Sequence, residues 1–239
     1  MLISVVIPAF NEEGNIGRLV RETFDAVPED RLGEVVVVDD CSTDATVGEL
    51  TSLKASYPKL RIIRHLTNAG QSASLRSGIV AARFPVIAQM DGDGQNDPRD
   101  IPALLARLGK PGERSEPALV GGVRTKRRDT GSKRWASKFA NWLRASILKD
   151  DCPDTGCGIK VYWREAFLKL PFFTSVHRYL PALFQTYGYK TAYAPVNDRP
   201  RVMGVSKYNN FNRALIGIYD LFGVTWLRRR TRSPDVTEI

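Results

Sequence analysis

The stretch Pro85-Val-Ile-Ala-Gln-Met-Asp-Gly-Asp-Gly-Gln95 places two carboxylates, Asp91 and Asp93, directly after a short apolar run. A buried strand that ends in acids presents oxygen ligands at the carboxyl end of an α/β sheet, where such sheets bind ligands. Mg²⁺ is usually held by one or two carboxylates together with substrate phosphates. The stretch therefore predicts a site for a divalent cation and a diphosphate, although Asp and Gly are also common in plain turns.

Strand and helix patterns alternate through the first half of the chain. Continuous apolar runs between helical patterns indicate parallel strands that are buried on both faces and joined by right-handed crossovers. The expected fold is α/β, with a mostly parallel central sheet flanked by helices. Strands are expected over residues 2–7, 34–38, 60–63, 86–90, 118–123, 159–163 and 191–196, and helices over 15–27, 45–57, 70–82, 98–108 and 133–148.

Polar loops follow the first two strands and should meet the Asp91 loop in one crevice, because parallel strands end at the same edge. In the first loop, Asn11 and Glu12 could accept hydrogen bonds from a nucleotide, and Asn11 could cap the next helix at the same time. In the second, Ser42 or Thr43 is expected to cap a helix, whereas Asp40 has no such need. A carboxylate there can accept from the imide N–H of uracil or the N1–H of guanine. A base without that donor would leave the charge unpaired, so the contact would discriminate strongly.

The net charge of +9 over 239 residues is unevenly distributed. Residues 124–149 hold nine Lys or Arg against one Asp, and residues 199–239 hold eight against three acids. Such clusters predict a surface for phosphates or for an acidic membrane face, with a solvated helix face as the plain alternative. We expect no nucleic-acid partner, because the acids at the strand ends would repel a phosphate backbone.

The cysteine content and the apolar segments near the termini give expectations about the cellular compartment. Cys41, Cys152 and Cys157, with only two histidines, argue against zinc and a disulfide framework and favour a reducing compartment. A strand pattern begins at residue 2, so we expect no signal peptide. Residues 214–227 form the longest run near the end without Lys, Arg or Glu, and their 14 residues are too few to span a bilayer.

Seven segments in order resemble family 2 glycosyltransferases with the Rossmann-like GT-A fold, in the dolichyl-phosphate mannosyltransferase-like or polyprenyl-phosphate glycosyltransferase branch. The resemblance covers about residues 2–210 and implies a GT-A catalytic domain over 1–210, followed by a tail over 211–239. The segments are VVIPAFNE (5–12), VVDDCSTD (37–44), NAGQ (68–71), MDGDGQ (90–95), DTGCG (154–158), HRYLP (177–181) and RVMGVSKY (201–208).

The resemblance also implies roles for single positions. Lys133 departs from it, because related enzymes can carry arginine there, and lysine lacks the bidentate fork. The implied nucleotide-binding residues are Pro8, Phe10, Glu12, Asp40 and Gln71; the implied ligands of Mg²⁺ or Mn²⁺ are Asp91, Asp93 and Gln95; and the implied catalytic set is Asp91, Asp93, Arg124, Ser137, Arg201 and Lys207.

The implied reaction is metal-dependent, inverting transfer of a sugar from GDP-mannose or a UDP-sugar to a polyprenyl (dolichyl or undecaprenyl) phosphate, which gives a lipid-linked monosaccharide. A phosphomonoester is largely anionic at neutral pH and needs neutralisation and alignment rather than a strong base. His177 and Asp154 are therefore expected to be structural. The alternative is a family 2 enzyme that glycosylates a polysaccharide or other hydroxyl in cell-envelope synthesis. It would need a carboxylate base within 124–158, where basic residues dominate.

The tail combines a helical apolar stripe with an arginine cluster at residues 228–232. Such a helix fits a membrane surface with anionic lipids, although it could pack on the catalytic domain or on a separate small membrane subunit. The expected location is cytoplasmic, peripheral at the cytoplasmic face of the membrane. The stripe consists of Phe211, Leu215, Ile218, Phe222 and Trp226.

Overall fold

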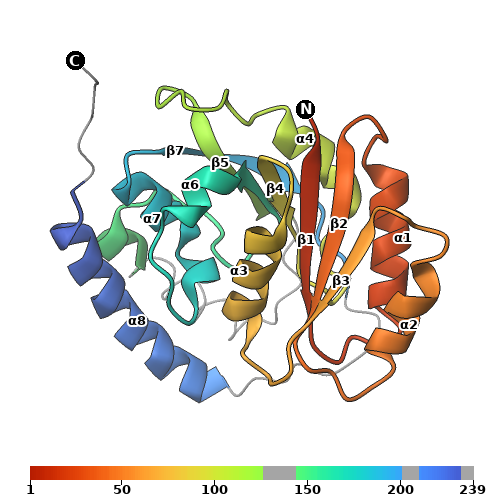
Figure 1. Cartoon of the computed structure of the whole chain (residues 1–239). Coiled ribbons are helices and arrows are strands. Elements are labelled where there is room, and N and C mark those ends of the chain that lie inside the picture. Colours follow the sequence, from red (N-terminus) through yellow and green to blue (C-terminus); the bar gives the residue numbers. More distant parts are fainter. Residues whose placement is uncertain (126–143, 201–209, 233–239) are drawn as a thin grey trace.

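The structure, a computed structural model, describes residues 1–125, 144–200 and 210–232. Within them, a mixed seven-stranded sheet has the order β3-β2-β1-β4-β6-β5-β7 (Figure 1). Only β6 runs antiparallel to its neighbours, so the predicted α/β fold with a mostly parallel sheet is confirmed. The strands are β1 (Ile3–Ala9), β2 (Leu32–Asp39), β3 (Leu60–Arg64), β4 (Val86–Gln89), β5 (Pro117–Arg124), β6 (Lys160–Trp163) and β7 (Lys190–Val196).

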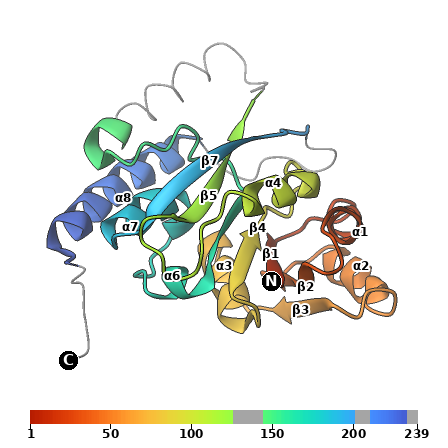
Figure 2. The same ribbon diagram turned by 90° about the horizontal axis from the view of Figure 1, so that it is seen from above.

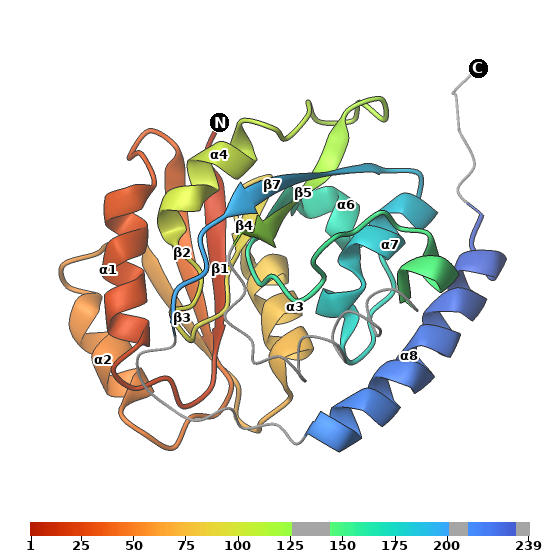
Figure 3. The same ribbon diagram turned by 180° about the vertical axis from the view of Figure 1, so that it is seen from behind.

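Helices cover both faces of the sheet, which explains why β1, β2 and β4 are almost wholly buried. α3 (Gln71–Ala81) lies on one face, and α1 (Ile16–Ala26) and α4 (Ile101–Leu105) lie on the other (Figures 1 and 3). Further helices are α2 (Thr46–Leu53), α6 (Arg164–Leu168), α7 (Leu180–Thr186), α8 (Asn210–Arg230) and two short 3₁₀ turns, η1 (Pro98–Asp100) and η2 (Val176–Arg178), and residues 144–148 are also helical.

A buried carboxylate near the start of β2 ties the amino ends of the strands together. The side chain of Glu34 is 3% exposed and accepts hydrogen bonds of 2.6 Å each from Ser4 Oγ, Arg61 Nη1 and Arg83 N–H. Burial alone would raise the pKa of Glu34, but these hydrogen bonds and the Arg61 charge outweigh it and lower the pKa below its ordinary value. The interaction therefore stabilises the fold above the unfolded-state pKa and is lost as the pH falls through the folded-state pKa.

α8 lies beside α7 (Figures 1 and 2) and has two unlike faces. Leu221 and Val224 are buried in the hydrophobic core, and Tyr179 Oη donates a hydrogen bond of 3.1 Å to the backbone oxygen of Gly217. The other face exposes large apolar side chains. Within the described residues, no helix is long and apolar enough to cross a membrane. The predicted boundary at residue 210 stays a prediction. The exposed large side chains of α8 are Ile216, Ile218, Tyr219, Phe222 and Trp226.

Candidate active site

Side chains of the second strand-end loop bind the backbone of the first loop. Ser42 Oγ accepts a hydrogen bond of 2.8 Å from Asn11 N–H, and Thr46 Oγ1 accepts one of 2.8 Å from Glu12 N–H. In return, Asn11 Oδ1 accepts from Thr43 N–H at 2.8 Å. These contacts fix the two loops against each other at the carboxyl ends of β1 and β2. The expectation that Asn11, Ser42 or Thr43 caps a helix was wrong, because the residues at the N-cap positions of α1 and α2 are Asn15 and Ala45.

Asp40 is held by three donors from the segment that follows β3. Its Oδ1 accepts hydrogen bonds from His65 Nδ1 at 2.7 Å and Ala69 N–H at 2.9 Å, and its Oδ2 accepts from Gly70 N–H at 2.7 Å. Burial alone would raise the pKa of Asp40, but the hydrogen bonds from Ala69, His65 and Gly70 lower it below its ordinary value. Because an ionised carboxylate has about four acceptor positions, Asp40 retains capacity for one further donor.

The two acids of the 91–93 loop are each ordered by nearby polar groups. Gln71 Nε2 donates to Asp91 Oδ1 at 2.7 Å, and Asp91 N–H donates to Asn96 Oδ1 at 3.0 Å. Gln95 N–H donates to Asp93 Oδ1 at 3.0 Å, so Gln95 shapes this turn through its backbone. Gln71, predicted to bind nucleotide, contacts an acid predicted to hold metal.

A two-residue link joins Asp40 to Asp91. Gly70 donates its N–H to Asp40, and the next residue, Gln71, donates its side-chain amide to Asp91. Both acids therefore lie at the carboxyl edge of the sheet, at the amino end of α3. This is the arrangement that the sequence predicts for a base-recognising acid and a diphosphate site.

The surroundings of Asp91 fit a divalent cation. A Cβ atom at Gly158 would come within 2.3 Å of Asp91 Oδ2, and one at Gly92 would come within 2.7 Å of the Pro8 carbonyl oxygen. Because neither glycine has a side chain, the backbone packs closely around the Asp91 carboxylate. Carboxylate oxygens are the ligand type that Mg²⁺ and Mn²⁺ prefer. Among residues 1–125, 144–200 and 210–232, no three His, Cys, Asp or Glu side chains gather to hold a metal.

Arg124, at the end of β5, forms a bidentate ion pair with Asp154. Its Nε lies 2.7 Å from Asp154 Oδ2 and its Nη2 lies 2.9 Å from Asp154 Oδ1. This hydrogen bonding raises the pKa of Arg124 against the opposing effect of burial. The Asp154 side chain is only 5% exposed, so the pair fixes the guanidinium plane while using two of its five N–H donors.

The other predicted nucleotide-binding residues lie around the first loop. Pro8 is half-buried within β1, pairs with Val38, and is followed by one more strand residue. Phe10 is 36% exposed just beyond β1, and Glu12 Oε2 accepts a hydrogen bond of 3.1 Å from Asn15 Nδ2. The predicted residues Ser137, Arg201 and Lys207, together with Lys133, lie outside the described residues.

Three contributors to the site were not predicted from the sequence. Asn96 and His65 hold Asp91 and Asp40, and Ser72 Oγ lies 2.7 Å from His177 Nδ1, which links α3 to η2. Asn96 follows Asp91 by five residues, so local turn chemistry could have indicated it. The other two contacts span 25 and 105 residues and leave no local signal.

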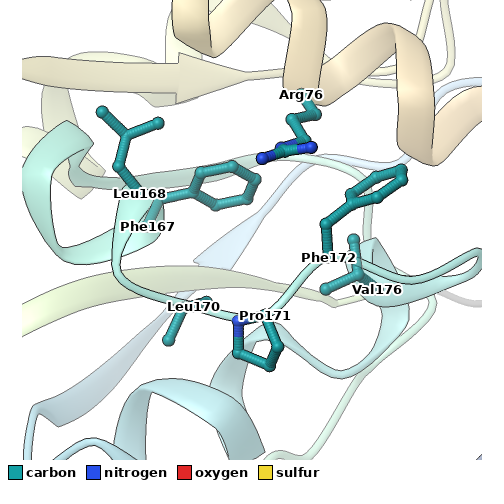
Figure 4. Close-up of a pocket in the computed structure, with 7 residues that line it drawn as sticks. All are labelled: Arg76, Phe167, Leu168, Leu170, Pro171, Phe172 and Val176. Carbon is teal, nitrogen blue, oxygen red and sulfur yellow. The ribbon is translucent and has the colours of Figure 1, made fainter.

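A small hollow lies away from this acid cluster, between α3 and the segment around α6 (Figure 4). Its volume is about 10 Å³, and Arg76 is the one charged side chain among the described residues that line it. The Arg76 guanidinium carbon lies 4.9 Å from the centre of the Phe172 ring. The hollow has room for about one water molecule. Its lining residues are Arg76, Phe167, Leu168, Leu170, Pro171, Phe172 and Val176.

The fold and the acid cluster define an α/β protein whose candidate site lies at the carboxyl ends of its parallel strands. Residues 4–170 match Glycosyl transferase family 2, and the chain belongs to this family. Dodecaprenyl-phosphate galacturonate synthase of Rhizobium johnstonii is 35% identical over 97% of this chain and 69% of its own length. Undecaprenyl-phosphate 4-deoxy-4-formamido-L-arabinose transferase of an Enterobacter species is 32% identical over 92% of this chain and 66% of its own length. The chain thus spans about two thirds of these relatives, whose names confirm the predicted polyprenyl-phosphate resemblance.

Solved structures share the fold. Glucosyl-3-phosphoglycerate synthase from Mycobacterium tuberculosis, in complex with Mn²⁺, UDP and phosphoglyceric acid, has a TM-score of 0.71 at 21% identity, over 98% of this chain and 80% of that chain. Mannosyltransferase PcManGT from Pyrobaculum calidifontis, in complex with GDP-Man and Mn²⁺, has a TM-score of 0.68 at 20% identity. The match covers 97% of this chain and 65% of that chain. The predicted GT-A fold is confirmed.

Proposed function

We propose that this protein transfers a sugar, with inversion, from a nucleotide sugar to a polyprenyl phosphate and so makes a lipid-linked monosaccharide. The observation that carries the proposal is the link from Asp40 through residues 70–71 to Asp91, because it joins the acid predicted to recognise the base to the acid predicted to hold the metal and diphosphate. The family and the two polyprenyl-phosphate relatives support this choice of reaction and acceptor.

On the donor side, Asp40 would accept the N–H of uracil or guanine, and Phe10 would lie against the nucleotide. The donor would accordingly be a UDP-sugar or GDP-mannose. Asp91 and Asp93, with Gln95, would hold Mg²⁺ or Mn²⁺ together with the diphosphate, as the Mn²⁺ complexes of fold neighbours support. The bound ion would neutralise the charge of the leaving nucleoside diphosphate.

On the acceptor side, Arg124 would receive the lipid phosphate, with Asp154 setting the plane of its guanidinium. An anionic phosphate oxygen attacks without a strong base, so positioned positive charge is the main requirement. The predicted partners in this task are Ser137, Arg201 and Lys207.

A hydroxyl acceptor fits less well. It would call for a carboxylate base in the 124–158 region, and two of the three acids described there are already paired with arginine. Asp154 is paired with Arg124, and the fully buried Asp150 is paired with Arg144. Both carboxylates are buried and held by a guanidinium, so neither is presented to an acceptor hydroxyl. A phosphate acceptor is therefore favoured.

We infer that the enzyme works peripherally at the cytoplasmic face of a membrane, where α8 would contact lipid. Phe222 and Trp226 are 72% and 62% exposed on this helix, which ends in Arg228, Arg229 and Arg230. Exposed aromatic side chains next to a cluster of arginines suit the interface of a bilayer that contains anionic lipid. A separate small membrane subunit that covers the same face is the alternative outcome.

The test is transfer by the purified full chain. The protein is incubated with undecaprenyl or dolichyl phosphate and a panel of labelled UDP- and GDP-sugars, with and without Mn²⁺. The panel should include donors of galacturonate and of 4-deoxy-4-formamido-L-arabinose. We expect organic-phase label from one donor in the presence of Mn²⁺, and none from Asp93→Asn at an unchanged melting temperature. Undiminished transfer by Asp93→Asn would refute the metal role, and no transfer from any donor would refute the function.

A further inference from the structure

A hydrogen-bonded chain of three side chains, Ser77–His65–Asp40, adjoins the proposed donor site. His65 Nδ1 lies 2.7 Å from Asp40 Oδ1, and His65 Nε2 lies 2.9 Å from Ser77 Oγ. The side chains of His65 and Asp40 are 16% and 4% exposed. His65 directly follows β3 and Ser77 belongs to α3, so the imidazole connects the two elements on either side of the acid.

The hydrogen bond between His65 and the Asp40 carboxylate fixes the tautomer of His65. Because the pKa of Asp40 is lowered, its carboxylate is ionised and only accepts hydrogen bonds. Nδ1 must therefore carry a proton and donate it to Asp40 Oδ1, and in the neutral ring Nε2 accepts from the Ser77 hydroxyl. The opposite tautomer would place two acceptors 2.7 Å apart. Ser77 is compatible with this tautomer, because its hydroxyl can donate to Nε2, and it holds the far side of the ring.

A nucleophilic role for Ser77 does not fit its position. Such a serine needs backbone N–H groups nearby to stabilise an oxyanion. Ser77 lies in the middle of α3 (Gln71–Ala81), where backbone N–H groups are used within the helix. The chain of three side chains therefore fits a supporting role for Asp40.

We propose that His65 is a positioning residue for recognition of the donor's nucleobase, with Ser77 holding the far side of its imidazole. This inference rests on the proposed function. His65 and Ala69 occupy Asp40 Oδ1, whereas Oδ2 takes a single hydrogen bond, from Gly70, among the described contacts. Oδ2 is thereby the oxygen that accepts the N–H of uracil or guanine. Adenine and cytosine lack that ring N–H, so His65 supports selection against them.

Two substitutions at position 65 distinguish the contribution of the Nδ1 contact from that of the Nε2 contact. The amide nitrogen of asparagine can take the place of Nδ1, and that of glutamine can take the place of Nε2. His65→Asn therefore keeps the donor to Asp40, while His65→Gln keeps only the contact with Ser77. Loss of one hydrogen bond to a charged group corresponds to about tenfold in affinity.

The experiment measures binding of UDP, GDP, CDP and ADP by calorimetry with Mn²⁺, followed by transfer kinetics. We expect His65→Gln to bind the preferred nucleotide about tenfold more weakly and to raise the donor KM similarly, at unchanged kcat and polyprenyl-phosphate KM. His65→Asn should remain close to wild type in these constants, and both variants should still unfold in a single cooperative thermal transition. Wild-type affinity in His65→Gln, or equal losses in both variants, would overturn the positioning role. A wild-type protein that binds no nucleotide would instead overturn the proposed function.

Discussion

Replacing Gly158 with alanine should misplace the carboxylate of Asp91. The new Cβ would lie 2.3 Å from Asp91 Oδ2 and 2.7 Å from Asn96 Oδ1. Ordinary contacts to carbon need about 3.5 Å, so the carboxylate must retreat by roughly 1 Å. The backbone itself would accept alanine, because Gly158 is absent from the residues with positive φ. A misplacement of about 1 Å at a reacting site can cost about 100-fold in rate, and we expect a loss of that order.

The assay compares Gly158→Ala with Gly48→Ala, a control in α2 where an added Cβ meets no atom within 4 Å. Both proteins are tested for transfer to polyprenyl phosphate at saturating donor and Mn²⁺, and for thermal unfolding. The control should keep full activity, and its melting temperature should stay the same or rise, because alanine favours helix.

Two results would refute this reasoning. Full activity in a folded Gly158→Ala protein would show that the position of Asp91 does not limit transfer. A loss of activity that only parallels a fall in melting temperature would show that the substitution acts on stability rather than on the site.

Three further predictions follow from other parts of the molecule. Asp154→Asn should loosen Arg124 and raise the KM for polyprenyl phosphate about tenfold at an unchanged donor KM, and equal changes in both constants would contradict the assignment. Glu34→Ala should lower the free energy of unfolding by about 3–5 kcal/mol in urea at pH 7. Because the pKa of Glu34 is lowered on folding, this deficit should shrink as the pH falls through the folded-state pKa, and a constant deficit would speak against it. Serine at both Phe222 and Trp226 should reduce sedimentation with anionic vesicles while nucleotide binding persists, and unchanged sedimentation would remove the lipid role of α8.

The boundaries of the strands could be predicted from the sequence to within about two residues, because buried parallel strands consist of unbroken apolar runs. β2 is the clearest case, with Val35 to Val38 all fully buried. α6 and α7 were not predicted. Both are short, at five and seven residues, so neither repeats an apolar period often enough to stand out.

The site was predictable where its residues follow strand ends, and less so where its contacts are long-range. Asp91 and Asp40 could be placed together from topology alone. The hydrogen bond between His65 and Asp40 could not be predicted in this way, because it depends on tertiary packing. The cap assignments failed for a related reason, since Asn and Ser donate and accept in bridges between loops as readily as at helix ends. Ser42 forms such a bridge to Asn11.

The most direct test of the account is the choice between two acceptors that differ only in the phosphate. The purified protein is given its preferred labelled nucleotide sugar with Mn²⁺ and either a polyprenyl phosphate or the matching free polyprenol. We expect labelled lipid from the phosphate alone, because the acceptor's own anionic oxygen is the nucleophile. Equal labelling of the free alcohol, or label found only in a water-soluble or polymeric product, would contradict it.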